Sequence, residues 1–363
     1  MAPQAVTVSF RLGGDDGVSV EARKWSAALR ALGFDTRRIA GEIQDAGEGD
    51  DVVVPGLAID ATQPPRAREL EDAFHGADLL IVDNLCSLPL NVDAARAVAR
   101  VAAAFRGRVC FRHHDLAGQR RRFAYLADEF PPRVEGALHA TVNLRSRREL
   151  EARGFTGAVT VHNYFDLAPS PGDRAATRRS FGFADGDFVV FQPARAIERK
   201  NVPGGIRFAQ RLGPLLPDAS LRYWLSGPAE DGYAPTLQRI LERAPFEVTL
   251  GRAPAAADAY AACDLVVFPS TWEGFGNPVI ESIAYRRPCA AHPYPVLAEI
   301  LAAGVRVFST ERPESVAHFL AENAEVQEQY YDVNVHRARI SFSIDQLPHA
   351  VDEAFRNHGW TAW

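Results

Sequence analysis

Short apolar runs alternate with helical patterns along the chain, and this alternation limits the folds that it can adopt. In the first half we expect strands over residues 6–10, 52–54, 79–82, 109–112, 140–142 and 159–161. Helices fit between them, for example over residues 20–32, 94–105 and 145–153. Parallel strands need long and usually helical crossover connections, so this order predicts βαβ units and a mostly parallel sheet.

The second half of the chain repeats the pattern. Strands are expected over residues 188–192, 221–226, 247–250, 265–269 and 288–291, and helices over residues 203–212, 235–244, 255–262 and 278–285. The Pro-, Ser- and Gly-rich stretch Leu167–Asp173 is typical of a linker. Because 363 residues exceed one ordinary core, we predict two domains. They cover residues 1–167 and 168–343, and residues 344–363 form a helix that packs back toward the first.

The composition excludes several classes of protein. The net charge of −6 gives no overall basic field for binding nucleic acid. Neither a signal peptide nor an apolar run long enough to span a bilayer is visible, so a cytoplasmic protein is expected. The sparse lysines and abundant Arg and Ala hint at a GC-rich bacterial genome. Four scattered cysteines are expected to be free thiols: Cys86, Cys110, Cys263 and Cys289.

Two cations follow the first expected strand of the second half. Arg195 leaves the carboxyl end of that strand, and Lys200 comes just before a helix with Asn201 as its cap and Pro203 in its first turn. The only other lysine of the chain is Lys24. Because a helix N-terminus presents free N–H groups, two cations there form a natural site for a diphosphate. A solvated basic turn is the alternative.

Two carboxylates flank a glycine-containing loop after the expected strand 265–269. Glu273 lies in this loop and Glu281 lies one turn into the next helix. Between them lie Gly274, Phe275, Gly276 and Asn277. Glycines let a ligand approach the backbone closely. Glu281 could accept hydrogen bonds from ribose hydroxyls, and Glu273 from those of a second sugar. A carboxylate that stabilises a helix N-terminus is the alternative for Glu281.

The segment Thr271–Ser282 resembles the E-x7-E segment of family 4 retaining glycosyltransferases. Arg195 and Lys200 are similar to the Arg/Lys pair that binds the donor diphosphate in that family. Two further pairs resemble its N-terminal glycine loop and the His-Asp pair often seen beside the donor sugar: Gly13-Gly14 and His114-Asp115. The matches occur in the family's order over nearly the whole chain.

The resemblance implies the GT-B fold, an α/β architecture of two Rossmann-like doubly wound domains that face an interdomain cleft. The first domain would bind the acceptor and the second the nucleotide-sugar. The implied reaction is metal- and cofactor-independent transfer of a hexose, with retention of configuration, from a UDP- or GDP-sugar. The acceptor would be a hydroxyl of a small molecule, a glycan or a lipid-linked compound.

The resemblance also implies roles for individual residues. Arg195 and Lys200 would stabilise charge on the leaving diphosphate, Glu273 would position the sugar, and His114 would orient or polarise groups near it. The remaining donor-binding residues would be Gly13, Gly14, Gly274, Phe275, Gly276, Asn277 and Glu281.

The chain departs from the family in two loops. The family often has Gly-Gly-x-Pro-Glu after its final strand, whereas this chain has Tyr294 and Pro295 in the corresponding loop. Both are bulkier than glycine, which puts inherited sugar contacts there in doubt. The first loop, Gly13–Gly17, is unusually acidic and disfavours a nearby anionic acceptor unless its aspartates point away.

Three other motifs have simpler interpretations. Asp185-Gly186-Asp187 matches a D-x-D metal motif but precedes a strand, so we expect a turn. His113-His114-Asp115 lacks a third metal ligand, and adjacent side chains on an extended segment diverge. Arg120–Arg122 and Arg145–Arg148 are expected to form a solvated basic face, in preference to a contact with lipid headgroups or an acidic acceptor.

Other functions remain open on the same architecture. A nucleotide-sugar epimerase would interconvert its donor without an acceptor, and a phosphorylase would require phosphate. A catalytically silent nucleotide-sugar-binding partner is a third possibility, which the presence of Arg195, Lys200, Glu273 and Glu281 argues against. A dinucleotide-dependent dehydrogenase is disfavoured because the first loop lacks G-x-G-x-x-G.

Overall fold

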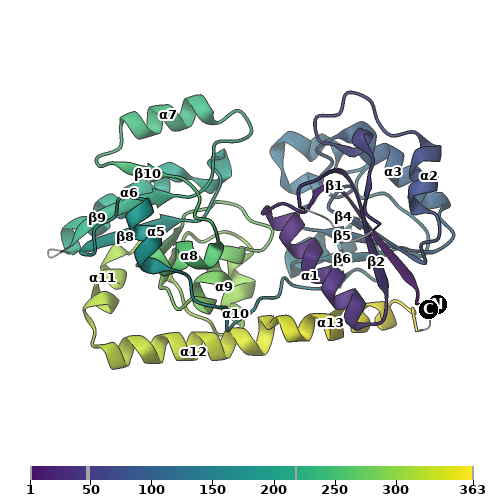
Figure 1. Ribbon diagram of the computed structural model, residues 1–363. Helices are drawn as coiled ribbons and strands as arrows, with labels where there is room; N and C mark the ends of the chain where they lie inside the picture. Colours follow the sequence, from purple (N-terminus) through teal and green to yellow (C-terminus); the bar gives the residue numbers. More distant parts are fainter. Residues whose placement is uncertain (1, 46–49, 217–218, 362–363) are drawn as a thin grey trace. The chain divides into compact units, whose positions relative to one another are not determined.

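The computed structural model describes residues 2–45, 50–216 and 219–361, and its contacts divide it into two compact units (Figure 1). The first unit comprises Met1–Tyr164 and Ile344–Trp363, and the second comprises Phe165–Ser343. The Pro-rich stretch 167–173 contains neither helix nor strand and lies at the start of the second unit.

A parallel sheet of seven strands, counted over the described residues, forms the centre of the first unit in the order β3-β2-β1-β4-β5-β6-β7. The strands are β1 (Gln4–Leu12), β2 (Asp35–Ile43), β3 (Val52–Val53), β4 (Leu79–Asp83), β5 (Arg108–His113), β6 (Leu138–Thr141) and β7 (Val159–Thr160). The helices are α1 (Gly17–Ala31), α2 (Ala67–Phe74), α3 (Val92–Ala104), α4 (Leu144–Ala152) and α13 (Leu347–Asn357). Short 3-10 turns are η1 (Pro55–Leu57), η2 (Ala117–Gln119), η3 (Arg121–Leu126) and η6 (Ile344–Gln346).

Both faces of this sheet are covered, because successive side chains of a strand point to opposite sides. Val6, Val8 and Val82 pack against α2 and α3 in one core cluster. Leu79 and Ile81 pack in a second cluster with apolar residues of α1 and α13. Helix α13, the last of the chain, is therefore part of the first unit.

Strand β2 was not predicted from the sequence. Its central residues include Arg37 and Arg38, so it lacks the clean apolar alternation of the other strands. Arg38 is buried on this strand because two carboxylates pair with it, Asp45 at 2.8 Å and Asp51 at 2.6 Å. These partners lie beyond the strand, and a local pattern therefore could not indicate the pairing.

The second unit contains a parallel sheet of six strands, within the part of the chain that the structure describes, in the order β10-β9-β8-β11-β12-β13. The strands are β8 (Asp187–Gln192), β9 (Ser220–Leu225), β10 (Val248–Leu250), β11 (Leu265–Phe268), β12 (Cys289–Ala291) and β13 (Phe308–Ser309). The helices are α5 (Arg174–Ser180), α6 (Val202–Leu212), α7 (Ala234–Glu242), α8 (Ala256–Ala262), α9 (Asn277–Ala284), α10 (Leu297–Ala302), α11 (Pro313–Ala321) and α12 (Ala324–Phe342), with 3-10 turns η4 (Glu198–Lys200) and η5 (Gly213–Leu215). The two sheets with their flanking helices confirm the predicted pair of Rossmann-like domains.

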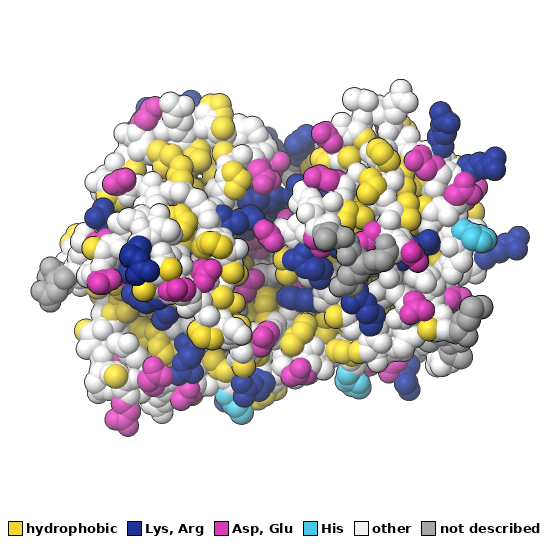
Figure 2. Space-filling model, in the orientation of Figure 1, with side chains coloured by type: hydrophobic (Ala, Val, Ile, Leu, Met, Phe, Trp, Pro, Cys, Tyr) yellow, Lys and Arg dark blue, Asp and Glu magenta, His cyan; other side chains and the backbone are white. Residues whose placement is uncertain are grey.

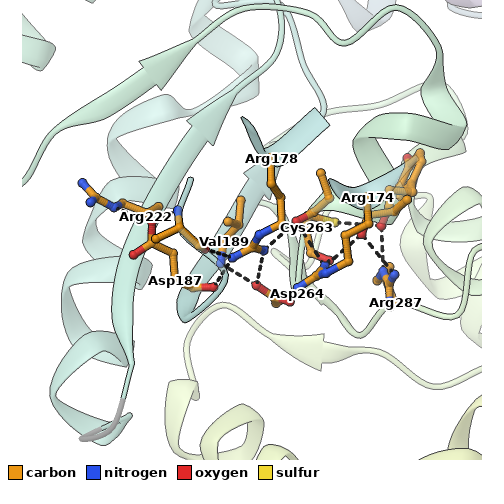
Figure 3. Close-up of polar contacts among 12 residues, drawn as sticks. Arg174, Arg178, Asp187, Val189, Arg222, Cys263, Asp264 and Arg287 are labelled. Atoms are coloured by element: carbon orange, nitrogen blue, oxygen red, sulfur yellow. Dashed lines mark hydrogen bonds and ion pairs between the residues drawn. The ribbon is translucent and has the colours of Figure 1, made fainter. Parts of the chain in front are cut away.

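A buried ionic network holds the amino ends of β8 and β11 together (Figure 3). The Arg178 side chain is 2% exposed and donates to the carbonyls of Ala262 and Ala184 at 3.0 and 2.7 Å. Asp264 accepts from Arg174 at 2.7 Å and from the backbone N–H of Val189 at 2.8 Å, and lies 3.3 Å from Arg178. The network therefore fixes α5 to the start of both strands.

The surface carries charges of both signs. Acidic and basic side chains are interspersed over the face of each unit shown in Figure 2. Within the predicted basic stretches, Arg120 pairs with Asp115 at 2.7 Å and Arg147 with Glu151 at 2.8 Å. A search of the described residues finds no helix that is both long and apolar enough to cross a membrane.

We predict that Arg178→Met lowers the free energy of unfolding by about 3 kcal/mol, because it removes a buried donor from the carbonyls of Ala184 and Asp187 and one ion pair from Asp264. Arg222→Met is the matched control, since Arg222 pairs with Asp187 at 3.0 Å but its side chain is 38% exposed. It should cost less than about 1 kcal/mol. Urea unfolding of both variants would measure the difference. Equal losses would contradict a structural role for the Arg178 network.

Candidate active site

The Arg195–Lys200 segment leaves the carboxyl end of β8. Its last residues form the short turn η4, and α6 begins two residues after Lys200. Asn201 adopts a left-handed conformation with φ of 48°, and its side chain accepts from the N–H of Gly204 at 3.1 Å. The predicted Asn201 cap and the position of Pro203 in the first turn are confirmed.

The loop that contains Glu273 leaves the neighbouring strand. β11 pairs directly with β8 in parallel, so the loops that follow them start at the same edge of the sheet. Gly276 precedes α9 with a φ of 115°, which favours glycine. A Cβ atom at this position would also lie 1.9 Å from the Tyr294 hydroxyl. The loop conformation therefore requires glycine at 276.

Ion pairs join the two loops. Lys200 Nζ lies 2.5 Å from Oε1 of Glu273, and Arg199 Nη1 lies 2.7 Å from Oε2. Arg199 Nη1 also donates to the carbonyl of Trp272 at 3.0 Å, and the Arg199 carbonyl accepts from the N–H of Thr271 at 2.9 Å. Arg199 was not predicted as a site residue, because its contacts depend on the approach of the second loop.

Burial and pairing shift the pKa values of this cluster. Lys200 and Glu273 are 9% and 7% exposed. Burial lowers the pKa of Lys200 to about 8, although the Glu273 carboxylate opposes the shift. Burial alone would raise the pKa of Glu273, but the Lys200 and Arg199 cations lower it to about 2. At neutral pH the pair is therefore ionised, and the Lys200 ammonium lies 5.4 Å from the centre of the Phe268 ring.

Arg195 has a different partner from Lys200. Its Nη1 atom lies 2.5 Å from Oε2 of Glu230, and the two side chains are 30% and 34% exposed. The segment before Glu230 is tied to the same loop, because the N–H of Ala196 donates to the carbonyl of Pro228 at 2.8 Å. Glu230 follows β9, and its contact with Arg195 could not be read from the sequence.

Glu281 lies one turn into α9, as predicted, and is half-buried. Its Oε2 atom accepts a hydrogen bond from the Tyr260 hydroxyl at 2.6 Å. Burial raises the pKa of Tyr260 well above its usual range, so this hydroxyl remains a donor. The Tyr260 ring stacks on Tyr285 with the ring centres 4.8 Å apart. The carboxylate is thus held in place by a buried phenol from α8.

The glycine loop of the first unit follows β1 directly. Gly13 has a φ of 80°, and an added Cβ atom would lie 2.6 Å from Oδ1 of Asp45. At Gly14 the added atom would lie 2.3 Å from Oε1 of Gln44. Gly13 therefore needs glycine, because its φ is positive and the Asp45 backbone nitrogen would lie 2.8 Å from the added atom, whereas at Gly14 only the flexible end of Gln44 stands in the way.

One aspartate of the acidic first loop acts as a helix cap. The Asp16 carboxylate accepts from the N–H groups of Val18 and Ser19 at 3.1 and 3.3 Å at the start of α1. It also lies 3.3 Å from the guanidinium of Arg11. The Asp16 charge is therefore partly neutralised by Arg11 and by the N-terminus of α1. The expectation that the acidic first loop disfavours an anionic acceptor is weaker for this reason.

His114 follows β5 and is held by residues at the end of β4. Its Nε2 atom lies 2.9 Å from Oδ1 of Asp83, whose Oδ2 accepts from Arg112 at 3.0 Å. The backbone N–H of His114 donates to Asn84 Oδ1 at 3.2 Å. Because a carboxylate only accepts, Nε2 is assigned the proton and Nδ1 the lone pair in the neutral ring. Asp83 and Asn84 were not predicted as site residues.

The remaining histidine and acidic motifs have structural roles. His113 points away from His114 and contacts Ser87 Oγ at 2.6 Å and His139 Nδ1 at 3.0 Å. Burial lowers the pKa of His139 to about 4. Asp185 lies in a turn before β8, as expected. Over the described ranges no group of three or more His, Cys, Asp or Glu side chains could hold a metal ion.

Comparison with known proteins connects this geometry to a family. Residues 194–325 match the family model described as glycosyl transferases group 1. Mannosylglucosylglycerate synthase of Thermotoga maritima is 25% identical, with 83% of each chain covered, and that of Petrotoga mobilis is 23% identical, with 90% of this chain and 89% of the relative covered. The chain is a glycosyltransferase, and it is similar to members of family 4.

Solved structures show that this glycosyltransferase has the GT-B fold. Anabaena Alr3699/HepE, solved with UDP and glucose, superposes with a TM-score of 0.74 at 17% identity and covers 98% of this chain and 99% of its own. WaaG, a glycosyltransferase involved in lipopolysaccharide biosynthesis, has a TM-score of 0.66 at 13% identity and covers 98% and 100%. At these identities the likeness concerns the fold alone.

The structure places the glycosyltransferase's predicted site residues in separate groups. Lys200 and Glu273 are in contact, whereas Arg195 pairs with Glu230 and Glu281 with Tyr260. The other predicted loop residues, Gly274, Phe275 and Asn277, lie between Glu273 and the first turn of α9. Gly13, Gly14 and His114 belong to the first unit. The roles assigned to all of these residues stay predictions.

We predict that Glu273 makes the protein sensitive to acid. Its pKa in the folded protein is about 2, below the ordinary value of 4.5, so its contribution is present above pH 4.5 and is lost as the pH falls toward 2. The full loss is on the order of 3 kcal/mol. Urea unfolding at pH 6 and pH 3 would measure the difference in free energy of unfolding between wild type and Glu273→Gln. We expect this difference to be smaller at pH 3. Glu230→Gln, which alters a half-exposed pair, is the control, and a pH-independent gap for Glu273→Gln would contradict the prediction.

Proposed function

We propose that this glycosyltransferase moves a hexose from a UDP- or GDP-sugar to a hydroxyl acceptor, with retention of configuration and without a metal or other cofactor. The observation that carries the proposal is the contact between Lys200 and Glu273. It joins loops from β8 and β11, where the strand order of the sheet reverses, and ligands of doubly wound sheets bind at such points. A cation that would bind phosphate and a carboxylate that would accept from sugar hydroxyls are therefore in contact.

The charges of this cluster support a diphosphate ligand. Two cations, Lys200 and Arg199, contact the single carboxylate of Glu273, so the cluster has excess positive charge. Together with Arg195, Lys200 would bind the diphosphate and stabilise the charge that develops as the bond to the anomeric carbon breaks. In the retaining reaction the acceptor oxygen forms the new bond on the same face, and its proton passes to the departing diphosphate.

The carboxylates would bind the sugars. Each oxygen of Glu273 accepts from one cation, and a carboxylate oxygen has two lone pairs, so hydroxyls of the transferred hexose could still donate to it. Glu281 would accept from the ribose while Tyr260 holds it. His114 would orient or polarise a substrate group through Nδ1, because Asp83 engages its Nε2 atom.

The relatives support a narrower choice of substrates. Two of them are named mannosylglucosylglycerate synthase, which favours mannosyl transfer to a small sugar acid. HepE has been solved with UDP-glucose, which supports a uridine nucleotide in the donor. Because Asp16 caps α1 and pairs with Arg11, the acidic first loop does not oppose a carboxylate-bearing acceptor strongly.

Calorimetric titration with UDP, GDP and ADP would test the donor site. We expect wild type to bind UDP or GDP, and Lys200→Ala to weaken this binding at least 100-fold because one of the two diphosphate cations is lost. Lys24→Ala is the matched control, since it removes the only other lysine, and should bind as wild type does. Equal binding by Lys200→Ala and wild type would contradict the diphosphate assignment.

The pKa of Lys200 predicts how diphosphate binding depends on pH. The pKa is lowered to about 8, so the ammonium that binds phosphate is lost as the pH rises through this value. The dissociation constant should be nearly constant below pH 7 and rise by up to about tenfold per unit above pH 8. Lys200→Arg should remove this rise, because a guanidinium stays charged throughout the range. Calorimetry from pH 6.5 to 9.5 would measure the dissociation constants of wild type and Lys200→Arg. An equal rise of the dissociation constant in both proteins would exclude Lys200 as its source.

A further inference from the structure

Tyr294 lies after β12, at the position where the resembling family often has a glycine loop. Its side chain is not exposed to a ligand, because the residue is only 3% accessible to solvent. Its hydroxyl donates to the carbonyl of Phe275 at 3.0 Å. Burial raises the pKa of Tyr294 well above its usual range, so the hydroxyl stays a donor.

The same side chain packs beside the two segments that flank Glu273, the end of β11 and the backbone at residues 275–276. Its ring packs edge-to-face on Phe268 with the centres 5.7 Å apart, and Phe268 in turn lies beneath the Lys200 ammonium. On its other side, the hydroxyl occupies the space where a Cβ atom of residue 276 would be, 1.9 Å away. Tyr294 therefore packs between Phe268 at the end of β11 and the backbone after Glu273.

Two of the hydrogen bonds that hold the loop lie on either side of Gly274. Arg199 donates to the carbonyl of Trp272, immediately before Glu273, and Tyr294 donates to the carbonyl of Phe275. A displacement of about 1 Å in a substrate-positioning group can cost a hundredfold in rate. A second anchor on this loop would therefore affect the position of the Glu273 carboxylate and of the amides that follow it.

We propose that Tyr294 is a positioning residue that fixes loop 273–277 for the transferred sugar. This inference rests on the proposed donor-binding role of that loop. Tyr294 acts through the backbone of Phe275 and does not touch the substrate. The aromatic side chain thus replaces the small residues of the related family with a support beneath the loop.

The test is Tyr294→Phe, which removes one hydroxyl and keeps the ring. We expect kcat for hexose transfer to fall about tenfold, while the affinity for free UDP or GDP changes less than threefold, because Lys200 and its neighbours remain. Tyr330→Phe is the matched control, since Tyr330 also donates to a backbone carbonyl, that of Arg306 at 2.7 Å, away from the loop. It should leave kcat unchanged. An unchanged kcat in Tyr294→Phe, or an equal loss in both variants, would overturn the proposal.

A double-mutant comparison shows whether Tyr294 acts through the Glu273 loop. In a Glu273→Gln background, Tyr294→Phe should lower kcat by less than threefold, because groups that act as a unit are not additive. A full tenfold loss in that background would overturn the positioning role. The proposed function fails separately, if wild type binds no nucleoside diphosphate and transfers no hexose.

Hydrogen exchange tests the positioning role without relying on activity. Tyr294→Phe should speed exchange of the amides of residues 273–277 at least tenfold relative to wild type, and Tyr330→Phe should not. Unchanged exchange in Tyr294→Phe would overturn the proposal even if transfer activity fell.

Discussion

The parallel pairing of β8 with β11 is the constraint on which the candidate site of the second unit depends. Val190 and Phe191 pair with Leu265 and Val266, so the two carboxyl ends meet at one edge of the sheet. The strand order reverses at this point, and crossover connections leave it in opposite directions. Lys200 and Glu273, which lie 73 residues apart in sequence, can therefore form a direct ion pair.

The opposite ends of the same strands are fixed by a different set of charges. Arg178 and Asp264 bind the amino ends of β8 and β11 through buried hydrogen bonds (Figure 3). The contacts of this network are mainly with backbone carbonyls and N–H groups of the chain itself. In the Lys200–Glu273 cluster two cations contact one carboxylate, which suits an anionic ligand. One end of the strand pair thus serves stability and the other is suited to binding.

Burying the Lys200–Glu273 pair does not by itself stabilise the fold strongly. Removing two charges from water costs several kcal/mol for each, and apolar residues of similar volume often replace such pairs without loss. The structure reduces this cost with a third charge, Arg199, and with the Phe268 ring beneath the ammonium. The cost of this pair at a sheet switch point therefore supports the proposed ligand-binding role.

Most of the fold could be predicted because its elements follow local periodicity. The strands around β4 and β8 are short apolar runs, and Asn201 caps a helix in a pattern visible within three residues. Strand β2 was missed because its buried Arg38 depends on Asp45 and Asp51, which lie outside it. A charged residue that is buried by partners outside its own strand leaves no apolar pattern within that strand.

In the candidate site, too, residues marked by a local sequence pattern were predicted, whereas their contacts with other segments were not. Arg195, Lys200, Glu273 and Glu281 were identified because each stands at a fixed distance from a strand end or a helix start. Their partners Glu230, Arg199 and Tyr260 were not, since each contact joins segments that only the sheet brings together. His114 was predicted from resemblance, whereas Asp83, which orients its ring, required the pairing of β4 with β5.

Tyr294 shows why a departure from a family pattern is difficult to interpret from sequence. A bulky residue in place of glycine suggests a lost contact with the donor sugar. In the structure the ring instead packs on Phe268 and its hydroxyl binds the carbonyl of Phe275. The same hydroxyl leaves no space for a side chain at Gly276, so the two positions are physically coupled. A larger residue at 276 would be compatible with this loop only if Tyr294 were replaced by a smaller one and the positive φ were also relieved.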